Sequence, residues 1–339
     1  MRTILVTGGA GFIGSNYVHY VLEQHPDYRV VVLDKLTYAG NLDNLRDLAG
    51  DPRLEFHQGD ICDQTTVERL AQGCWAIVNF AAESHVDRSL MDPGDFIRTD
   101  IYGVYVLLQA VRKFGVERFV QISTDEVYGS VPHGSSREDD RLAPRNPYSA
   151  SKAGGELQAR AFYESYGVPV LITRSSNNIG PYQYPEKVVP LFITNAIDDQ
   201  PLPIYGRGTA VRDYIYVKDH CAAIDLVLHQ GTPGEAYNVG GGNEVNTVQL
   251  ATAILDLLGK PHDLMRFVED RPGHDQRYSL DCSKIQALGW RRQYDFPQAL
   301  ELTVRWYVEN QWWWRKLKSG EYLRYYQEQY GRRLAAAQR

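Results

Sequence analysis

Residues 8–14 of this chain read GGAGFIG, and they decide the fold. The glycines follow a short apolar run, Thr3–Thr7, and lead into Asn16–Gln24, where apolar residues recur with helical spacing. A glycine turn between a strand and a helix lets the backbone approach a pyrophosphate closely, and the helix N-terminus favours its negative charge. We therefore predict a dinucleotide-binding turn, with cofactor contacts at Gly8, Gly11, Phe12, Ile13 and Gly14.

The next strand indicates which dinucleotide is bound. Arg29–Leu33 is a second apolar run, and Asp34 follows it about twenty residues after Gly14. An acid in this place accepts hydrogen bonds from ribose hydroxyls and disfavours a 2′-phosphate, so NAD is expected rather than NADP. Lys35 beside Asp34 weakens that preference. The GxxGxxG spacing of the turn resembles the extended short-chain dehydrogenase/reductase superfamily.

Similar short apolar runs recur along the first half of the chain. They lie at Leu54–Phe56, Ala76–Phe80, Phe119–Ser123 and Val168–Thr173, separated by segments of helical length. Strands that are uniformly apolar and alternate with helices are typical of a parallel sheet covered on both faces. We predict an α/β fold, with a Rossmann-type doubly wound parallel sheet that binds NAD over residues 1–176.

The pattern loosens from about Asn177. Short helices such as Val248–Leu258 follow a stretch with five prolines, Pro181, Pro185, Pro190, Pro201 and Pro203. We interpret residues 177–339 as a smaller, mixed α/β lobe that binds the substrate. A segment near 212–228 is expected to return to the first domain.

Composition excludes several classes of protein. The chain has 339 residues, 43% of them hydrophobic, and a net charge of -6, so it lacks the basic excess of a nucleic-acid-binding surface. Its four cysteines have neither metal-site nor disulfide spacing, and we expect no metal ion. No apolar run approaches the roughly 18 residues that span a bilayer, and the N-terminus has no apolar signal core. We expect a cytoplasmic protein with no membrane partner.

Two neighbouring acids, Asp125 and Glu126, follow the predicted strand in ISTDEVYGS, Ile122–Ser130. One interpretation is structural, because Ser123 and Glu126 have the spacing of a capping box at a helix start. The other is catalytic, because paired acids can serve as general acid and general base. Side chains alternate along a strand, so both acids can reach one pocket only if the strand ends at about Ser123.

A second chemical pattern is YSASK, in which Tyr148 and Lys152 are four residues apart. This spacing places both on one face of a helix, where a Tyr/Lys pair is most often simply exposed. Beside a dinucleotide, however, Lys152 can lower the pKa of Tyr148 and hold the nicotinamide ribose. The phenolate can then take a proton from a sugar hydroxyl while hydride passes to NAD.

Six motifs resemble, in order, those of the dTDP-glucose 4,6-dehydratase family. They are AAESHVDRS from Ala81, STDEVYG from Ser123, YSASK from Tyr148, SSNNIGPYQYPEK from Ser175, VRDYIYV from Val211 and DRPGHDQRY from Asp270. The resemblance covers most of the chain. It implies dehydration of dTDP-glucose to dTDP-4-keto-6-deoxyglucose through transient oxidation at C4 by tightly bound NAD.

The resemblance also implies a role for each catalytic residue. Oxidation of C4 to a ketone makes the C5 proton acidic and the C6 hydroxyl a leaving group. Tyr148, supported by Lys152, is then the base at C4, and Thr124 is the hydrogen-bond partner of the C4 oxygen. Glu126 is the base at C5, and Asp125 is the acid that protonates the departing hydroxyl.

Binding residues follow from the same resemblance. Further cofactor contacts are expected at Leu36, Thr37, Asp60, Ile61, Ala81, Ala82, Thr99 and Asn178. Contacts to the sugar, phosphates or base are expected at Ser84, Asn177, Lys187, Val188, Pro203, Ile204, Tyr205, Arg212, Asn246, Arg271, His274 and Tyr330. Arg212 and Arg271 are the expected phosphate ligands. The family also implies a homodimer, joined by a four-helix interface of the Tyr148 helix and a helix at about Thr99–Phe114.

Two alternatives remain open. A nucleotide-sugar epimerase or decarboxylase shares the cofactor turn, Tyr148 and Lys152 but has no need of two acids after Thr124. A non-catalytic NAD sensor needs the glycine turn alone. The chain departs from the family's usual residues at Ile179 and Lys218, which leaves the base preference of the substrate open.

Overall fold

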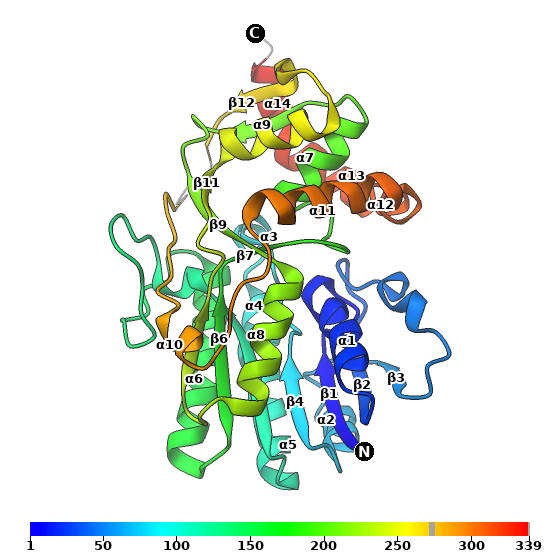
Figure 1. Ribbon diagram of the computed structural model, residues 1–339, viewed down its shortest axis with the longest axis vertical. Helices are drawn as coiled ribbons and strands as arrows, with labels where there is room; N and C mark the ends of the chain where they lie inside the picture. Colours follow the sequence, from blue (N-terminus) through cyan, green and yellow to red (C-terminus); the bar gives the residue numbers. More distant parts are fainter. Residues whose placement is uncertain (271–274, 338–339) are drawn as a thin grey trace.

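The computed structural model describes residues 1–270 and 275–337. A seven-stranded sheet forms the lower half of the molecule, and a smaller lobe lies above it (Figure 1). The strand order is β10-β6-β5-β4-β1-β2-β3, and all neighbours are parallel. Apart from the additional edge strand β10, this is the order of a Rossmann fold. The strands are β1 (Arg2–Thr7), β2 (Tyr28–Asp34), β3 (Leu54–Gln58), β4 (Ala76–Asn79), β5 (Arg118–Thr124), β6 (Val170–Ser175) and β10 (Ala236–Val239).

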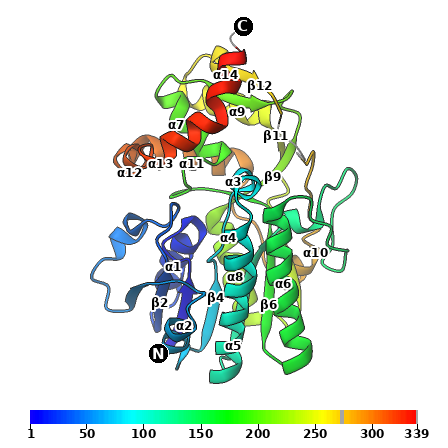
Figure 2. The ribbon, with the colours of Figure 1, turned by 180° about the vertical axis from the view of Figure 1, so that it is seen from behind.

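Helices cover both faces of this sheet. Helices α1 (Phe12–Gln24) and α8 (Val217–Gln230) pack on one face, while α2 (Gln64–Ala71), α5 (Val104–Phe114) and α6 (Pro147–Tyr166) pack on the other (Figures 1 and 2). The middle residues of strand β1 are uniformly apolar because they are buried on both faces of the sheet. Ile4 and Val6 belong to the core under α1 and α8, whereas Leu5 belongs to the core under α2 and α5.

Short helices and turns lie between the strands and the longer helices. They are η1 (Leu42–Leu48), α3 (Val86–Met91), α4 (Gly94–Ile97), the π-helical turn η2 (Arg98–Gly103), the 3₁₀ turn η3 (Asp125–Tyr128) and α10 (Ser283–Ala287). The helix expected at Thr99–Phe114 is therefore a π turn followed by α5. The helix expected at Asn16–Gln24 begins earlier, at Phe12, because Gly11 is its N-cap.

The upper lobe contains two small sheets and a set of helices. The sheets pair β7 (Asn177–Ile179), β9 (Val211–Tyr216) and β11 (Glu244–Asn246), and β8 (Leu202–Tyr205) with β12 (Met265–Val268). The remaining elements are α7 (Val188–Ile197), α9 (Thr247–Leu258), η4 (His262–Leu264), α11 (Phe296–Glu309), α12 (Gln311–Leu317), α13 (Glu321–Tyr326), the π turn η5 (Gln327–Gly331) and α14 (Arg332–Ala337). Phe192, Tyr307, Trp313 and Trp314 fill the core of this lobe.

The chain crosses between the two parts more than once. The segment expected to return near 212–228 contains α8, whose apolar face joins the core of the sheet domain. The return extends further along the chain, because β10 adds the seventh strand beside β6. The limits of the two domains stay a prediction, but the sheet draws residues from well beyond position 176.

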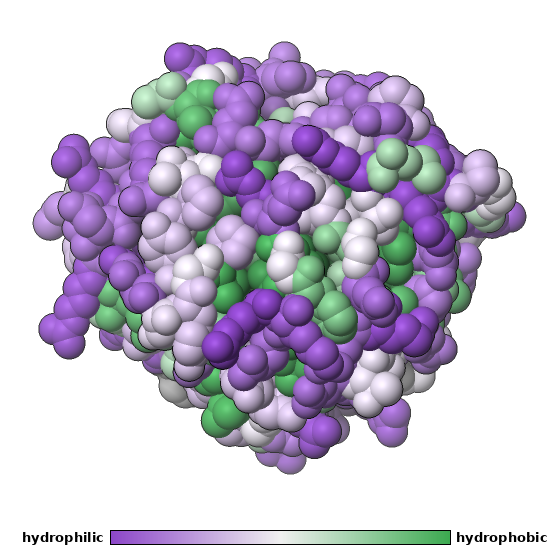
Figure 3. Space-filling model, turned by 90° about the horizontal axis from the view of Figure 1, so that it is seen from below, coloured by the Kyte–Doolittle hydropathy of each residue, from purple (hydrophilic) through white to green (hydrophobic). Residues whose placement is uncertain are grey.

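Across residues 1–270 and 275–337, no helix is long and apolar enough to cross a membrane. The end of the molecule opposite the upper lobe is a mosaic of hydrophilic and apolar residues (Figure 3).

Candidate active site

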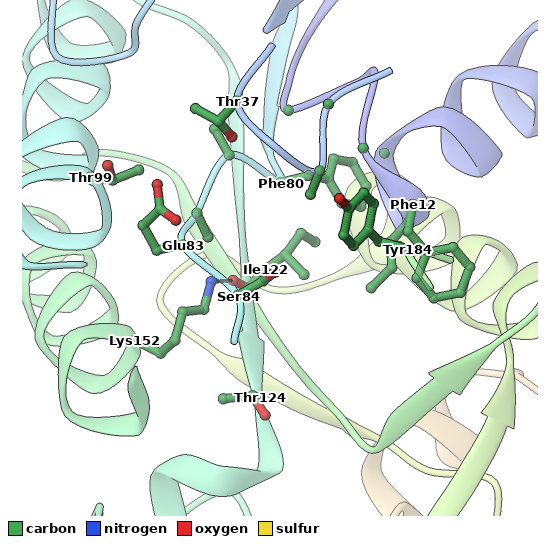
Figure 4. A pocket seen from close by; sticks show the side chains of 18 of the residues that line it. Phe12, Thr37, Phe80, Glu83, Ser84, Thr99, Ile122, Thr124, Lys152 and Tyr184 are labelled. Atoms are coloured by element: carbon green, nitrogen blue, oxygen red, sulfur yellow. Dashed lines mark hydrogen bonds between the residues drawn. The ribbon is translucent and has the colours of Figure 1, made fainter. Parts of the chain in front are cut away.

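A cavity of about 300 Å³ lies at the carboxyl ends of the central strands, with residues of β7 and of the segment before α7 on its other side. This edge of an open parallel sheet, where the strand order reverses, is where ligands bind in such folds. Figure 4 shows Phe12, Thr37 and Phe80 lining one part of the cavity and Thr124 and Lys152 another. One cavity therefore joins the predicted cofactor and catalytic residues.

The glycine turn forms one wall of this cavity. Gly8 has a positive φ of 67°, and a Cβ on it would lie 2.6 Å from the Ala81 nitrogen. A Cβ on Gly14 would overlap the Gly8 carbonyl oxygen. The N-cap of α1 is Gly11, which supplies no side-chain cap, so the first N–H groups of the helix are left for a ligand. These features fit a bound pyrophosphate.

Asp34 lies at the end of β2, next to the glycine turn. Its Oδ2 accepts a hydrogen bond of 2.9 Å from the Ala10 N–H, and its Oδ1 accepts one of 2.8 Å from the Leu36 N–H. Burial raises the pKa of Asp34, and these two hydrogen bonds act in the opposite direction. Lys35 pairs instead with Asp60, at 2.9 Å, so its charge is directed away from Asp34. This arrangement favours a ribose with a free 2′-hydroxyl.

Most of the predicted cofactor residues line the cavity. Leu36 does not, although its backbone N–H holds Asp34. The residues that do are Gly8, Gly11, Phe12, Ile13, Gly14, Asp34, Lys35, Thr37, Asp60, Ile61, Ala81, Ala82, Thr99, Tyr148, Lys152 and Asn178. Their contacts to a dinucleotide stay predictions.

The paired acids leave the strand together. Strand β5 ends at Thr124, and Asp125 and Glu126 begin the η3 turn, one residue later than the transition expected at Ser123. Both acids line the cavity. The capping-box interpretation was wrong in its residue, because the Thr124 side chain, not Ser123, accepts the hydrogen bond from the Glu126 N–H. The Ser123 hydroxyl is buried and has no hydrogen-bond partner among the described residues.

Asp125 lies in an environment that favours its protonated form. Burial raises its pKa well above the ordinary value, and the carboxylates of Glu126 and Asp213 raise it further. The Thr124 hydroxyl donates to Asp125 Oδ1 at 3.1 Å. Oδ2 is buried and makes no hydrogen bond within the described part of the chain. A protonated carboxyl with an unused oxygen on a cavity can donate a proton to a ligand.

Tyr148 and Lys152 reach the cavity from α6. Tyr148 and Thr124 line the same cavity, while Lys152 Nζ donates to the Ile122 carbonyl oxygen at 2.8 Å. The expectation that Lys152 lowers the pKa of Tyr148 beside a bound dinucleotide stays a prediction. Burial raises that pKa well above its ordinary value, and the nearby carboxylates of Glu126 and Asp100 add to the effect. Lys152 is itself buried, which lowers its pKa.

The predicted substrate residues divide into two groups. Ser84, Thr124, Asn177 and Lys187 line the cavity. Lys187 Nζ donates to the Ser84 carbonyl oxygen, and Asn177 Oδ1 is buried without a hydrogen-bond partner among the described residues. A ligand could supply that partner.

The second group belongs to the upper lobe and does not line the cavity, although Arg212 interacts electrostatically with Asp125. Ile204 is fully buried in the lobe core, and Asn246 is the N-cap of α9. The ring centres of Tyr330 and Tyr205 lie 5.9 Å apart. Arg212 donates to the Asp275 carbonyl oxygen at 3.0 Å. Val188 and Pro203 also do not line the cavity. Arg271 and His274 lie outside the described residues.

The sequence analysis also did not name as site residues several that line the cavity, such as Glu83, Gln183 and Tyr184, or two that lie next to it, Tyr278 and Glu186. The Tyr278 hydroxyl lies 3.4 Å from Glu126 Oε2 and donates to Asp275 Oδ2 at 2.7 Å. Glu186 is buried and accepts a hydrogen bond of 3.1 Å from Arg88 Nε. Both lie inside motifs quoted above, Tyr278 at the end of DRPGHDQRY and Glu186 beside Lys187, so membership of those motifs was the available signal.

Comparisons with known proteins agree with this geometry. The family model described as GDP-mannose 4,6 dehydratase matches residues 5–303. The dTDP-glucose 4,6-dehydratase of Streptomyces antibioticus is 49% identical over 321 residues, which cover 93% of this chain and 95% of the relative.

Solved structures show the same pattern. The crystal structure of DesIV, a dTDP-glucose 4,6-dehydratase from Streptomyces venezuelae with NAD bound, superimposes with a TM-score of 0.92 at 51% identity and covers 94% of this chain and 100% of that one. A UDP-glucose 4-epimerase from Thermus thermophilus in complex with NAD reaches a TM-score of 0.83 at 32% identity, over 91% of this chain and 100% of that one. Dehydratases and epimerases thus share this fold, and the residues after β5 have to distinguish them.

Proposed function

The chain belongs to the family described as GDP-mannose 4,6 dehydratase, and from this premise we propose that it is an NAD-dependent hydro-lyase that converts dTDP-glucose to dTDP-4-keto-6-deoxyglucose. The observation that carries the proposal is the η3 turn. It brings two acids, Asp125 and Glu126, to the same cavity as Tyr148. The reaction removes one water molecule and involves no net oxidation.

The first half of the reaction uses α6 and the end of β5. Tyr148, in the phenolate form that the positive charges of Lys152 and bound NAD would favour, takes the proton of the C4 hydroxyl, and Thr124, which lines the same cavity, orients the C4 oxygen. Lys152, whose charge interacts with that of Asp100, binds the ribose of the nicotinamide. When bound, NAD supplies the acceptor for the C4 hydride and later returns that hydride to C6.

The second half uses the η3 turn. The ketone at C4 acidifies the C5 proton, which Glu126 removes, while Asp125 gives its proton to the C6 hydroxyl so that water departs. The proton on Glu126 exchanges with solvent, and Glu126 then delivers a solvent-derived proton to C5 as the hydride reaches C6. The raised pKa of Asp125 supports its role as the acid, because the carboxyl must hold a proton before elimination begins.

A 4-epimerase is the nearest alternative. It would use the same cofactor turn, Tyr148 and Lys152, but it would leave Asp125 and Glu126 without a chemical role. The position of both acids on the cavity therefore favours dehydration. A sensor that only binds NAD would need neither the acids nor Tyr148.

We also propose a homodimer in the cytoplasm. Large apolar side chains are exposed along the outer side of α4, η2, α5 and α6, which lie next to one another in Figure 2. They are Ile97, Tyr102, Tyr105, Leu157 and Tyr166. Such a stripe supports pairing with a second copy through these helices. The four cysteines are free thiols, as is usual in a reducing compartment.

The proposal is tested by incubating the purified protein with dTDP-, UDP-, GDP- and CDP-glucose. A 4-keto-6-deoxy sugar has a characteristic absorbance in alkali, and we expect it with dTDP-glucose at the highest rate. Absence of this product with all four, in protein confirmed to contain NAD, would refute the dehydratase assignment. A higher rate with another nucleotide would correct the base preference alone.

A further inference from the structure

Arg174 is a buried cation next to the catalytic residues that has no part in the mechanism above. It lies on β6, and only 3% of its surface is exposed. Its Nε donates to both carboxylate oxygens of Glu156, at 3.0 and 3.1 Å, and its Nη2 also donates to Glu156. Glu156 is equally buried, so this is a forked ion pair inside the protein.

The other end of the same guanidinium reaches a different element. Nη1 donates to the Tyr128 hydroxyl and to the Glu138 carbonyl oxygen, the latter at 2.9 Å. The guanidinium carbon lies 4.9 Å from the centre of the Tyr128 ring. Tyr128 in turn donates to Asn238 Oδ1 at 2.8 Å, which connects the group to β10. The planar guanidinium of Arg174 allows this one side chain to hold both Glu156 and Tyr128.

These two neighbours belong to the two halves of the proposed machinery. Glu156 lies on α6, one turn beyond Lys152 and two turns beyond Tyr148, so the three share a helix face. Tyr128 is the last residue of the η3 turn, which begins with Asp125 and Glu126. Arg174 therefore joins the helix that carries the C4 oxidation residues to the turn that carries the elimination residues.

We propose that Arg174 is a positioning residue that holds α6 and the η3 turn in register, through Glu156 on one side and Tyr128 on the other. The inference rests on the proposed function. It assigns Arg174 no contact with the substrate. The residue acts through the placement of Tyr148 relative to Asp125 and Glu126, because a displacement of about 1 Å between reacting groups slows a reaction by roughly a hundredfold.

A purely structural ion pair would behave differently. Replacing both members of a buried pair by apolar residues of similar size commonly preserves stability, whereas removing one member leaves a costly lone charge. The double variant Arg174→Met/Glu156→Leu therefore separates the two roles. It removes both buried charges but leaves Tyr128 without its connection to α6.

Tyr128→Phe is a second, milder variant. It removes the hydroxyl that Arg174 contacts and leaves the ion pair to Glu156 intact. Val227→Ala is the matched control, because Val227 is fully buried on α8 and belongs to the core of the sheet domain. It lowers stability without touching either catalytic element.

The experiment is a single turnover of dTDP-glucose by the NAD-loaded enzyme. The absorbance of reduced nicotinamide reports oxidation at C4, and solvent deuterium at C5 reports elimination. In the double variant and in Tyr128→Phe we expect C4 oxidation within a few fold of wild type and elimination slowed by about a hundredfold. Reduced nicotinamide then accumulates. Val227→Ala should keep the wild-type ratio of the two rates.

Three results would overturn the inference. In the first, the double variant and Tyr128→Phe both keep the wild-type ratio of the C4 oxidation rate to the elimination rate. In the second, Val227→Ala changes this ratio as much as those two variants do. A wild-type enzyme that forms no 4-keto-6-deoxy product would instead refute the proposed function, and the inference with it. Full product formation by wild type and an unchanged ratio in the variants refutes only the role of Arg174.

Discussion

Asp125 and Glu126 are neighbours in the chain with different surroundings. Asp125 is buried beside the carboxylates of Glu126 and Asp213. Burial and these two charges raise its pKa and so favour its protonated form. Glu126 is only partly buried, and its Oε2 lies within 3.4 Å of the Tyr278 hydroxyl. Two carboxyl groups whose environments differ in this way can serve as acid and base in one reaction.

Glu126→Gln should separate the two halves of the reaction. We expect reduction of NAD by dTDP-glucose to persist, while incorporation of solvent deuterium at C5 falls by at least a hundredfold, because the amide cannot accept the C5 proton. Stopped-flow absorbance and mass spectrometry measure the two steps. Tyr148→Phe is the opposite control, since it should suppress the initial reduction. Equal loss of both steps in Glu126→Gln would contradict the assignment of Glu126 as the C5 base.

The pH dependence of elimination should report the protonation of Asp125. The acid form is the proton donor, so the elimination rate is expected to fall as the pH rises through the raised pKa of Asp125. Asp213→Asn removes one of the charges that raise this pKa, and the falling limb should move to lower pH. The asparagine oxygen can still accept the hydrogen bond that Asp213 takes from the Asn243 N–H at 2.6 Å.

Asp225→Asn is the control for that profile, because Asp225 lies on α8 and pairs with His25 at 3.0 Å, away from the cavity. Its profile should match that of the wild-type enzyme. A falling limb that stays in place in Asp213→Asn would show that a group other than Asp125 controls elimination.

The strands of the main sheet were predicted well because their sequences are apolar on both faces. The runs at Thr3–Thr7 and Arg29–Leu33 became β1 and β2 with changes of one residue at the ends. Strand β10 was missed, since Ala236–Val239 is short and lies in a region assigned to the lobe. The π turn at Arg98–Gly103 was also missed, because helical spacing alone does not distinguish a π turn from an α-helix.

The glycine turn is the element on which, in our proposal, cofactor binding depends. Gly8→Ala should lower the affinity for NAD by tenfold or more, because its Cβ would meet the backbone of Ala81 and displace the turn. Gly50→Ala is a matched control, since Gly50 also has a positive φ, of 94°, but nothing lies within 4 Å of a Cβ there. Both variants carry the penalty of about 1–2 kcal/mol for an L-residue at a positive φ.

Titration of each NAD-free variant with NAD, followed by calorimetry, measures the difference. Equal affinities in Gly8→Ala and Gly50→Ala would contradict the role of the turn. A loss in both would indicate general strain instead.

The candidate site was predictable to the extent that it lies on the sheet. Gly8, Asp34, Asp125 and Tyr148 follow strands or begin helices whose order the sequence reveals, and all line one cavity. Residues of the lobe, such as Arg212 and Tyr330, do not line this cavity. Their position could not be predicted, because it depends on how the lobe packs above the sheet. That packing is a long-range property which local patterns do not encode.

The proposed homodimer concerns the whole molecule. Leu157→Glu places a charge in the exposed apolar stripe on α6, and we expect it to convert a dimer to a monomer at micromolar concentration. Leu257→Glu is the control, because Leu257 is also exposed but lies on α9 in the lobe. Sedimentation velocity measures both. A wild-type monomer, or a dimer insensitive to Leu157→Glu, would contradict the proposed interface.

The central claim is that one hydride leaves C4 and returns to C6 of the same sugar. The most direct measurement uses dTDP-glucose carrying deuterium at C4 and locates the label in the product by NMR. The proposal predicts deuterium in the C6 methyl group, with solvent hydrogen at C5. Deuterium found back at C4, as expected for an epimerase, or lost from the sugar altogether, would contradict it.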